Sequence, residues 1–163
     1  MKKINFLIII ILLLFANISY SQKGITIMGS GGVLSIDKEN TFNINSSISY
    51  NFNSKYSIGA EILNSKFDTN SSDFKVDYYL LYGEYSMPNK GFIKDKLYFS
   101  LLLGAGMSIQ KNDIINNEEF AVMIGAKLNY KVTDNTKIGL KSGFYFADFD
   151  NSIVNNLFIS YRF

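Results

Sequence analysis

Residues 153–163 read IVNNLFISYRF, and this last stretch decides the fold. Counting back from the C-terminal phenylalanine, every second position is apolar: Phe163, Tyr161, Ile159 and Leu157. On the alternate positions, Arg162, Ser160 and Asn156 are polar. Because successive side chains of a β-strand point to opposite faces, one face of this segment suits lipid and the other suits water or a polar interior. The alternation therefore predicts a membrane-spanning β-strand.

Seven further segments show the same period-two alternation between turn-forming residues. The eight predicted strands run from Ile25 to Ile36, Thr41 to Phe52, Tyr56 to Lys66, Phe74 to Met87, Leu97 to Gln110, Glu119 to Val132, Thr136 to Ala147 and Ile153 to Phe163. Each is at least as long as the roughly 9–11 tilted residues that cross a bilayer. Strands of soluble proteins average about five or six residues. The pattern predicts an all-β fold, an eight-stranded antiparallel up-and-down transmembrane β-barrel.

Alternation alone does not say which face points inward. A soluble barrel of the lipocalin type would turn its apolar face toward a ligand. The distribution of aromatic residues favours the membrane barrel over the soluble one. They collect toward the ends of the strands, where rings lie at headgroup depth in a membrane barrel. We predict an aromatic girdle of Tyr50, Phe52, Tyr56 and Tyr130 at one end and of Phe42, Phe74, Phe120 and Phe146 at the other.

The beginning of the chain has the pattern of a secretory signal peptide. Lys2 and Lys3 precede an apolar run, and Ser19 and Ser21 then stand at small-x-small spacing before Gln22. A transmembrane helix is the alternative, but it needs about 20 apolar residues and this run has roughly half that number. We predict that residues 1–21 are a signal peptide, cleaved after export through the Sec pathway. Residues 22–163 are then one barrel domain in the outer membrane of a Gram-negative bacterium.

The predicted connections and the fourth strand carry further expectations. With both termini in the periplasm, we expect short turns at the periplasmic end and longer loops at the external end. In the fourth strand, Asp77 and Glu84 have opposite parity, so one of them would face lipid. We expect a β-bulge to resolve this conflict, or a position for Glu84 at the periplasmic rim.

The residue types exclude several kinds of chemistry. The chain contains no histidine and no cysteine, which removes the usual general base and thiol nucleophile. Ser142 and Lys141 are no Ser-Lys pair, because neighbours in a strand face opposite sides. The net charge of +2 and the dispersed lysines do not favour nucleic acid. We predict that the protein is not an enzyme, with no catalytic residue, no cofactor, no metal site and no nucleic-acid partner.

Charged residues are expected inside the barrel. The alternation points Glu61, Lys127, Lys141 and Arg162 into the lumen, with Asp77 as a further candidate. An eight-stranded barrel is just wide enough for its side chains, so we expect an ion-pair network, with Glu61 and Arg162 coupled. Its expected hydrogen-bond partners are Asn45, Asn129 and Asn156. A structural plug and an ion pathway both fit, and barrels of this size favour the plug.

From the predicted signal peptide to Phe163, the chain resembles small eight-stranded outer-membrane β-barrel proteins of the OmpX/OmpA-barrel type, in the compact form common among Bacteroidetes. The resemblance rests on the alternation, the aromatic girdle and the last strand. That strand resembles the C-terminal signal read by the barrel-assembly machinery, at Leu157, Ile159, Tyr161 and Phe163.

The resemblance implies a membrane barrel with a role in adhesion, defence or envelope integrity, and no transferable active site. The expected partners are outer-membrane lipids, lipopolysaccharide and, during insertion, the barrel-assembly machinery; we expect a monomer. We favour a structural or surface-interaction protein whose polar lumen is filled by side chains. The alternative is a narrow pore or carrier for small polar solutes.

Overall fold

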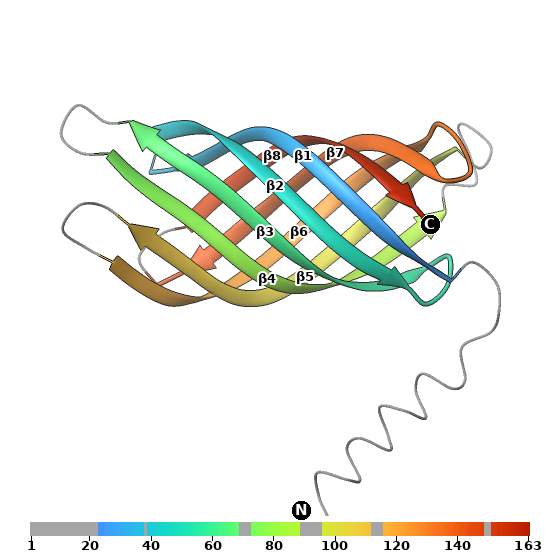
Figure 1. The fold of residues 1–163 in the computed structure, drawn as a ribbon, viewed down its shortest axis with the longest axis horizontal. Helices are drawn as coiled ribbons and strands as arrows, with labels where there is room; N and C mark the ends of the chain where they lie inside the picture. The colour runs from blue at the N-terminus through green and yellow to red at the C-terminus, as the bar shows by residue number, and fades with distance from the viewer. Residues whose placement is uncertain (1–22, 38, 69–72, 89–95, 112–115, 149–150) are drawn as a thin grey trace, which may run out of the picture.

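The computed structural model describes residues 23–37, 39–68, 73–88, 96–111, 116–148 and 151–163. These residues form eight strands: β1 (Gly24–Ile36), β2 (Glu39–Asn51), β3 (Tyr56–Asp68), β4 (Asp73–Pro88), β5 (Leu97–Lys111), β6 (Asn116–Lys131), β7 (Thr136–Ala147) and β8 (Asn151–Arg162). Each strand pairs antiparallel with the next, and β1 pairs with β8, so the sheet closes on itself (Figure 1). The predicted eight-stranded antiparallel barrel is confirmed. The predicted signal peptide lies outside the described residues.

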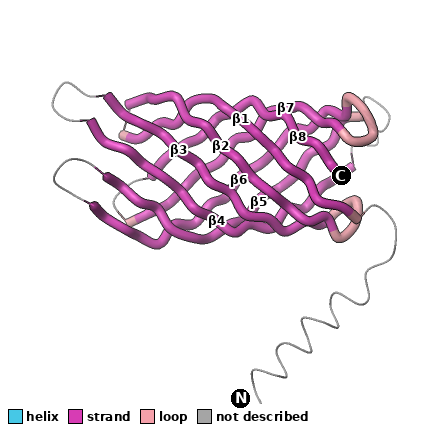
Figure 2. The backbone as a smooth tube through the Cα atoms, viewed as in Figure 1, coloured by secondary structure: helices cyan, strands magenta, loops and turns pink. Residues whose placement is uncertain are grey.

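The strands run obliquely around the barrel, and both ends of the described chain lie at one end of it (Figure 2). We call this end, which carries Gly24 and Phe163, the terminal end, and the other the distal end. Within the described ranges, no helix is long and apolar enough to span a membrane.

The strands extend further than predicted at the distal end. There β2 begins at Glu39, β3 ends at Asp68 and β6 begins at Asn116. Backbone pairing does not require apolar side chains, so the ladder continues past the last apolar position. The distal connections are reduced to residues 37–38, 69–72, 112–115 and 148–150, whereas the longest connection, residues 89–96, lies at the terminal end. The expected asymmetry of short turns and longer external loops is therefore wrong.

Two short turns at the terminal end are closed in the same way. The side-chain oxygen of Asn53 accepts hydrogen bonds from the backbone N–H groups of Lys55 and Tyr56, at 2.8 and 2.9 Å. The hydroxyl of Thr133 accepts from the N–H groups two and three residues later. In both turns, a side chain accepts the hydrogen bonds of nearby backbone N–H groups, so the turn depends on a residue within the turn itself. At the distal end, Asp37 instead adopts the left-handed conformation with φ 46°, which Asp tolerates in tight hairpins.

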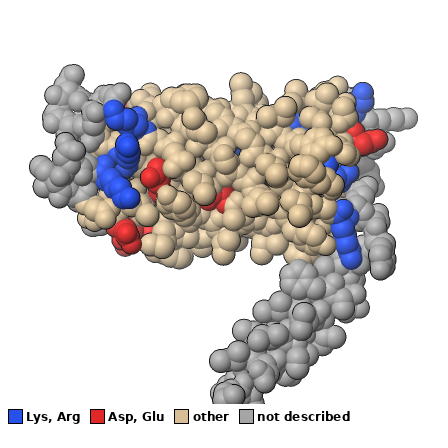
Figure 3. All heavy atoms as spheres, in the orientation of Figure 1, with Lys and Arg blue, Asp and Glu red and all other residues tan. Residues whose placement is uncertain are grey.

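The outward face of the barrel is apolar. On β2, Phe42, Ile44 and Ile48 are each more than half exposed, whereas Asn43 and Asn45 are fully buried. On the face seen in Figure 3, Lys and Arg side chains lie toward the two ends, and a broad, mostly uncharged band separates them. Soluble monomers rarely expose a contiguous apolar surface of this kind. The predicted outward orientation of the apolar face is confirmed, and the lipocalin-type alternative is wrong.

Glycines on the inner face make room for interior rings. A Cβ at Gly59 would lie 2.7 Å from the Tyr82 ring, and a Cβ at Gly139 would lie 2.9 Å from the Phe158 ring. Because an eight-stranded barrel has little internal volume, large inward side chains need such small residues opposite them. Small residues in the wall therefore leave room for the large inward side chains of Tyr82 and Phe158.

Candidate functional site

A buried ion pair crosses the middle of the barrel. Glu61 on β3 and Lys141 on β7 form a salt bridge, and both side chains are 0% exposed. The Tyr145 hydroxyl donates to Glu61 Oε1 at 2.6 Å and accepts from Lys141 Nζ at 3.2 Å. β3 and β7 are not neighbours in the sheet, so this cluster joins separate parts of the wall through the lumen.

A second ion pair lies beside the first. Lys127 Nζ on β6 lies 2.9 Å from Glu84 Oε2 on β4, and both side chains are largely buried. In the sheet, Lys127 lies directly opposite Lys141, an arrangement that is destabilising for like charges. Each lysine is neutralised by a carboxylate from β3 or β4. The two pairs together resolve the repulsion between neighbouring ammonium groups.

Three of the predicted lumen residues are therefore brought together, namely Glu61, Lys127 and Lys141. Asp77 is not among them. It lies on the outer face of β4, where it accepts a hydrogen bond of 2.8 Å from the Asn64 amide. The β4 ladders continue on both sides without a bulge over the described residues, so Asp77 points outward and Glu84 inward. The assignment of Asp77 to the lumen and the expected bulge are wrong.

Glu84 is the interior residue that the sequence did not assign. Both faces of β4 carry aromatic and aliphatic residues, because Tyr78 and Leu80 point inward while Tyr79 and Leu81 point outward. Asp77 is also as far from the distal end of β4 as Glu84 is from its terminal end. Neither parity nor position in the strand therefore separates them, and only the barrel register does.

Arg162 lies apart from the central cluster. Its guanidinium donates to the backbone carbonyl of Asp134, in a turn at the terminal end, at 3.2 Å. Glu61 is paired with Lys141 instead, so the expected coupling of Glu61 with Arg162 is wrong. Asn129 bonds Tyr98 and Ser100. The Asn156 amide forms a hydrogen bond with the Asn43 amide. Neither Asn129 nor Asn156 therefore bonds an ion pair directly.

An apolar cluster lies mainly in the distal part of the interior, and one of its members, Tyr82, also lines the terminal part. Its members are fully or almost fully buried and come from every strand except β2: Leu34, Ile36, Leu63, Phe67, Val76, Tyr78, Leu80, Tyr82, Leu102, Ala121, Met123, Tyr145 and Val154. Tyr78 and Tyr145 contact each other with ring centroids 5.0 Å apart, and the Tyr78 hydroxyl lies 2.8 Å from Ser152 Oγ. The prediction of a polar lumen is therefore wrong at the distal end, where the interior is apolar.

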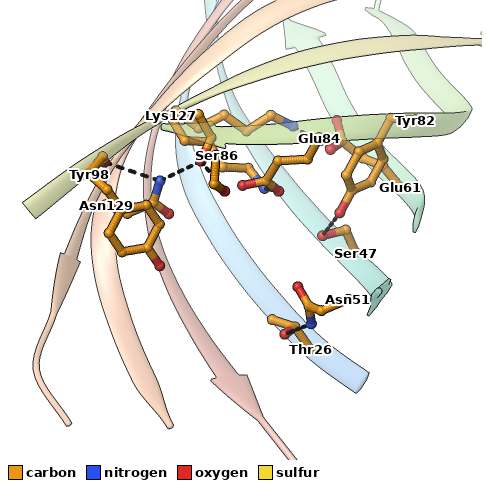
Figure 4. Close-up of polar contacts among 12 residues, drawn as sticks. Thr26, Ser47, Asn51, Glu61, Tyr82, Glu84, Ser86, Tyr98, Lys127 and Asn129 are labelled. Atoms are coloured by element: carbon orange, nitrogen blue, oxygen red, sulfur yellow. Dashed lines mark hydrogen bonds and ion pairs between the residues drawn. The ribbon is translucent and has the colours of Figure 1, made fainter. Parts of the chain in front are cut away.

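A cavity of about 440 Å³ occupies the terminal part of the interior. Its wall carries hydroxyl and amide groups: Tyr82 donates to Ser47 Oγ at 3.3 Å, and Asn51 donates to Thr26 Oγ1 at 2.8 Å (Figure 4). Glu84 and Lys127 border this cavity, but Glu61 and Lys141 do not. The lumen therefore changes from apolar through ionic to open and polar along its axis.

Cations gather at the mouth of the cavity. Lys131 Nζ lies 2.6 Å from Asp134 Oδ1, and this hydrogen bond, together with the ammonium charge, holds the pKa of the Asp134 carboxyl below its ordinary value. Lys137 lies directly opposite Lys131 in the sheet, and its Nζ is 4.9 Å from the centroid of the Tyr98 ring. The mouth thus carries more positive than negative side chains.

The predicted aromatic positions mostly lie on the outer surface. Phe42, Phe120 and Phe146 are exposed toward the distal end, and Tyr50, Phe52, Tyr56 and Tyr130 are exposed or half-buried at the terminal end. Phe74 is the exception. It shares the inward parity of Val76 and stacks on buried Phe67, with ring centroids 4.5 Å apart. Its assignment to the girdle is wrong, because β4 has aromatic residues on both faces.

The last strand presents its apolar side chains outward. Leu157, Ile159, Tyr161 and Phe163 are all exposed, and the Tyr161 and Phe163 rings meet edge to face at 4.9 Å. The backbone N–H of Phe163 donates to the carbonyl of Ile25 at 2.9 Å, at the seam where β8 meets β1. The terminal aromatic residue therefore lies at the closure of the barrel and is accessible from outside.

Known structures share this fold. Neisserial surface protein A is similar with a TM-score of 0.70 at 12% identity, covering 86% of this chain and 97% of that one. The N-terminal β-barrel domain of Pseudomonas aeruginosa OprF gives 0.62 at 14%, covering 87% and 100%. Ail, the attachment invasion locus protein of Yersinia pestis, solved with the heparin analogue sucrose octasulfate, gives 0.61 at 18%, covering 86% and 97%.

These neighbours are small eight-stranded outer-membrane β-barrels, as the sequence resemblance predicted. No protein-family model matches the chain. No curated protein matches it either. At these identities the likeness establishes the fold and leaves the role to be argued from the site.

Proposed function

We propose that this chain is a non-enzymatic structural barrel of the outer membrane of a Gram-negative bacterium, closed to solute by its own side chains. One observation carries the proposal: the Glu61–Lys141–Tyr145 cluster lies fully buried across the lumen, next to an apolar cluster. An ion that crossed the barrel would have to separate this pair and then enter apolar packing without water, which is costly for a charge. The barrel therefore serves as a membrane-embedded body and not as a pore.

The outer surface supports the location in a membrane. Large apolar side chains point outward and cover the barrel between its charged ends. Every strand is also long enough to span a bilayer. Only closed barrels and helices satisfy their backbone groups in lipid. Export through the Sec pathway and insertion by the barrel-assembly machinery, which would read Phe163 at the β8–β1 seam, are parts of the same proposal.

A row of lysines suggests which lipid the distal end meets. Lys66 on β3 lies directly opposite Lys75 on β4, and Lys75 lies directly opposite Lys111 on β5. All three side chains are exposed on the outer face. Lys75 and Lys111 are like charges on adjacent strands and repel each other, and phosphate groups of lipopolysaccharide in the outer leaflet would neutralise them. We propose that this lysine row binds lipid phosphates and that the protein acts as a monomer surrounded by lipid.

Planar-bilayer conductance tests the closed lumen. The refolded wild-type protein should insert without producing steady single-channel steps, and its heat-modifiable migration on gels gives an independent check of folding. Steady wild-type steps that disappear in the Lys141→Glu variant would show that ions pass the central cluster, and the proposal would then fail.

The lysine row has a separate test. Binding of the refolded protein to vesicles that contain lipopolysaccharide can be compared with binding to vesicles that contain dephosphorylated lipopolysaccharide. We expect the Lys75→Gln variant to lose the preference for the phosphorylated form. A preference that persists in this variant would argue against the row as the contact.

A further inference from the structure

The cavity at the terminal end carries an excess of positive charge that the protein does not neutralise. Cationic lining residues are Lys55, Lys127, Lys131, Lys137 and Arg162, and the only carboxylates among the lining residues are Glu84 and Asp134. The described wall of the cavity therefore has three more positive than negative side chains. Low-dielectric barrel walls strengthen this field inside the cavity.

Two of the three unmatched charges, Lys137 and Arg162, lie on the adjacent strands β7 and β8. Glu84 pairs with Lys127, and Asp134 pairs with Lys131. Among the residues that the structure describes, no carboxylate is within ion-pair distance of Lys137 or Arg162. Lys137 lies opposite Ser160 on β8, two residues before Arg162. Both side chains line the same cavity, so an anion between them would relieve their repulsion.

A neutral donor is available at the same place. The Tyr98 hydroxyl is buried and has no hydrogen-bond partner among the described residues, and Lys137 Nζ lies over the ring that carries it. Buried hydroxyls are usually paired, so this group is suited to donate to a ligand. The rest of the wall offers serine hydroxyls and asparagine amides, which suit a polar molecule.

We propose that the cavity binds a small polar molecule through a phosphate or carboxylate group, held by Lys137, Arg162 and the Tyr98 hydroxyl. The volume of about 440 Å³ is within the usual range of small-molecule sites, about 300–1,000 Å³. Turn residues at the terminal end form part of the lining, so the ligand enters from that end. This inference goes beyond the structural role and does not depend on whether the barrel conducts.

Equilibrium dialysis of the refolded protein in an uncharged detergent at low ionic strength tests the site. Radiolabelled inorganic phosphate and radiolabelled citrate are the two probes, and they distinguish a phosphate ligand from a carboxylate ligand. We expect saturable binding of one equivalent of at least one probe. The Lys137→Gln and Arg162→Gln variants should each bind about tenfold more weakly, since each loses a charge-assisted hydrogen bond.

Lys96→Gln is the matched control. Lys96 is exposed at the terminal end and does not line the cavity, so this variant makes the same charge change outside the site and should bind as the wild type does. The Tyr98→Phe variant keeps the ring, removes only the hydroxyl, and should weaken binding even if a charge variant fails to fold. Absence of saturable wild-type binding for both probes, or an equal loss in Lys96→Gln, would overturn the proposal.

Discussion

Replacing Glu61 and Lys141 one at a time should destabilise the barrel more, in sum, than replacing both together. Both side chains are fully buried, and each bonds the other and the Tyr145 hydroxyl. The Glu61→Gln variant leaves the Lys141 ammonium without a carboxylate in the lumen, and the Lys141→Met variant leaves the carboxylate without its cation. Removing one member of a buried pair costs about 3–5 kcal/mol, so we expect a loss of that size from each single change.

The double variant removes both charges and leaves no ion to desolvate. Replacing a buried pair by neutral groups of similar volume is often close to neutral, so the combined loss should be smaller than the sum of the single losses. We expect a coupling energy of at least about 2 kcal/mol, within the range found for contacting residues. The Tyr145 hydroxyl can still donate to the amide oxygen in place of the carboxylate, which keeps one interior hydrogen bond.

Urea unfolding of the protein in lipid vesicles measures these losses, with heat-modifiable migration on gels as the readout of the folded fraction. The Lys131→Met variant is the control, because Lys131 pairs with Asp134 at the surface, where the carboxylate side chain is 90% exposed. Exposed pairs contribute little, so no measurable loss is expected there. If the losses at Glu61 and Lys141 add to within about 0.5 kcal/mol, the two residues are not energetically coupled and the reasoning is refuted.

Three further predictions follow from the wall of the barrel. The Leu81→Arg variant places a charge in the middle of the outward face of β4 and should lose about 2–4 kcal/mol in urea unfolding from vesicles; an unchanged midpoint would mean that this face does not meet lipid. A Cβ at Gly106 would meet the Tyr79 carbonyl and the backbone of β4, whereas Gly83 has open space, so Gly106→Ala should cost about 1–3 kcal/mol and Gly83→Ala less than about 0.5 kcal/mol. Deleting Phe163 should lower the folded fraction in outer membranes, measured by heat-modifiable migration after fractionation, while refolding in detergent stays normal; wild-type levels in the membrane would contradict its role as an assembly signal.

The alternation of residue types identifies the inward face clearly on some strands and not on others, for a physical reason. On β2 the inward positions are mostly Asn and Ser and the outward ones are mostly Ile and aromatic residues, so parity alone identifies the face. On β8 the outward side chains of Leu157, Ile159 and Tyr161 identify the face, although Val154 and Phe158 also point inward. On β4, Tyr and Leu occupy both faces, because the same residue types suit lipid outside and the apolar cluster inside. This ambiguity accounts for the errors at Asp77 and Phe74 and for the missed role of Glu84.

The partners in the ion pairs could not be predicted from the sequence for a different reason. Alternation says that Glu61 and Lys141 point inward, but their pairing across the lumen depends on the height of each residue along the barrel axis. That height follows from strand tilt and register, which no local pattern specifies. Arg162 has the correct parity for the lumen, but it lies at the terminal end next to the turn that contains Asp134, so the sequence pairing with Glu61 was wrong.

The position of the central charges explains why the two ends of the lumen differ in what they can bind. Lys127 and Lys141 face each other across β6 and β7, so the inner wall there needs the carboxylates that β3 and β4 supply. Apolar packing shields Glu61 and Lys141 on the distal side, whereas Glu84 and Lys127 border the open cavity. An anion held by Lys137 and Arg162 in the cavity would therefore meet the Glu84–Lys127 pair before the Glu61–Lys141 pair. The Glu61–Lys141 pair would remain intact, so occupancy of the cavity would leave the closure of the barrel unchanged.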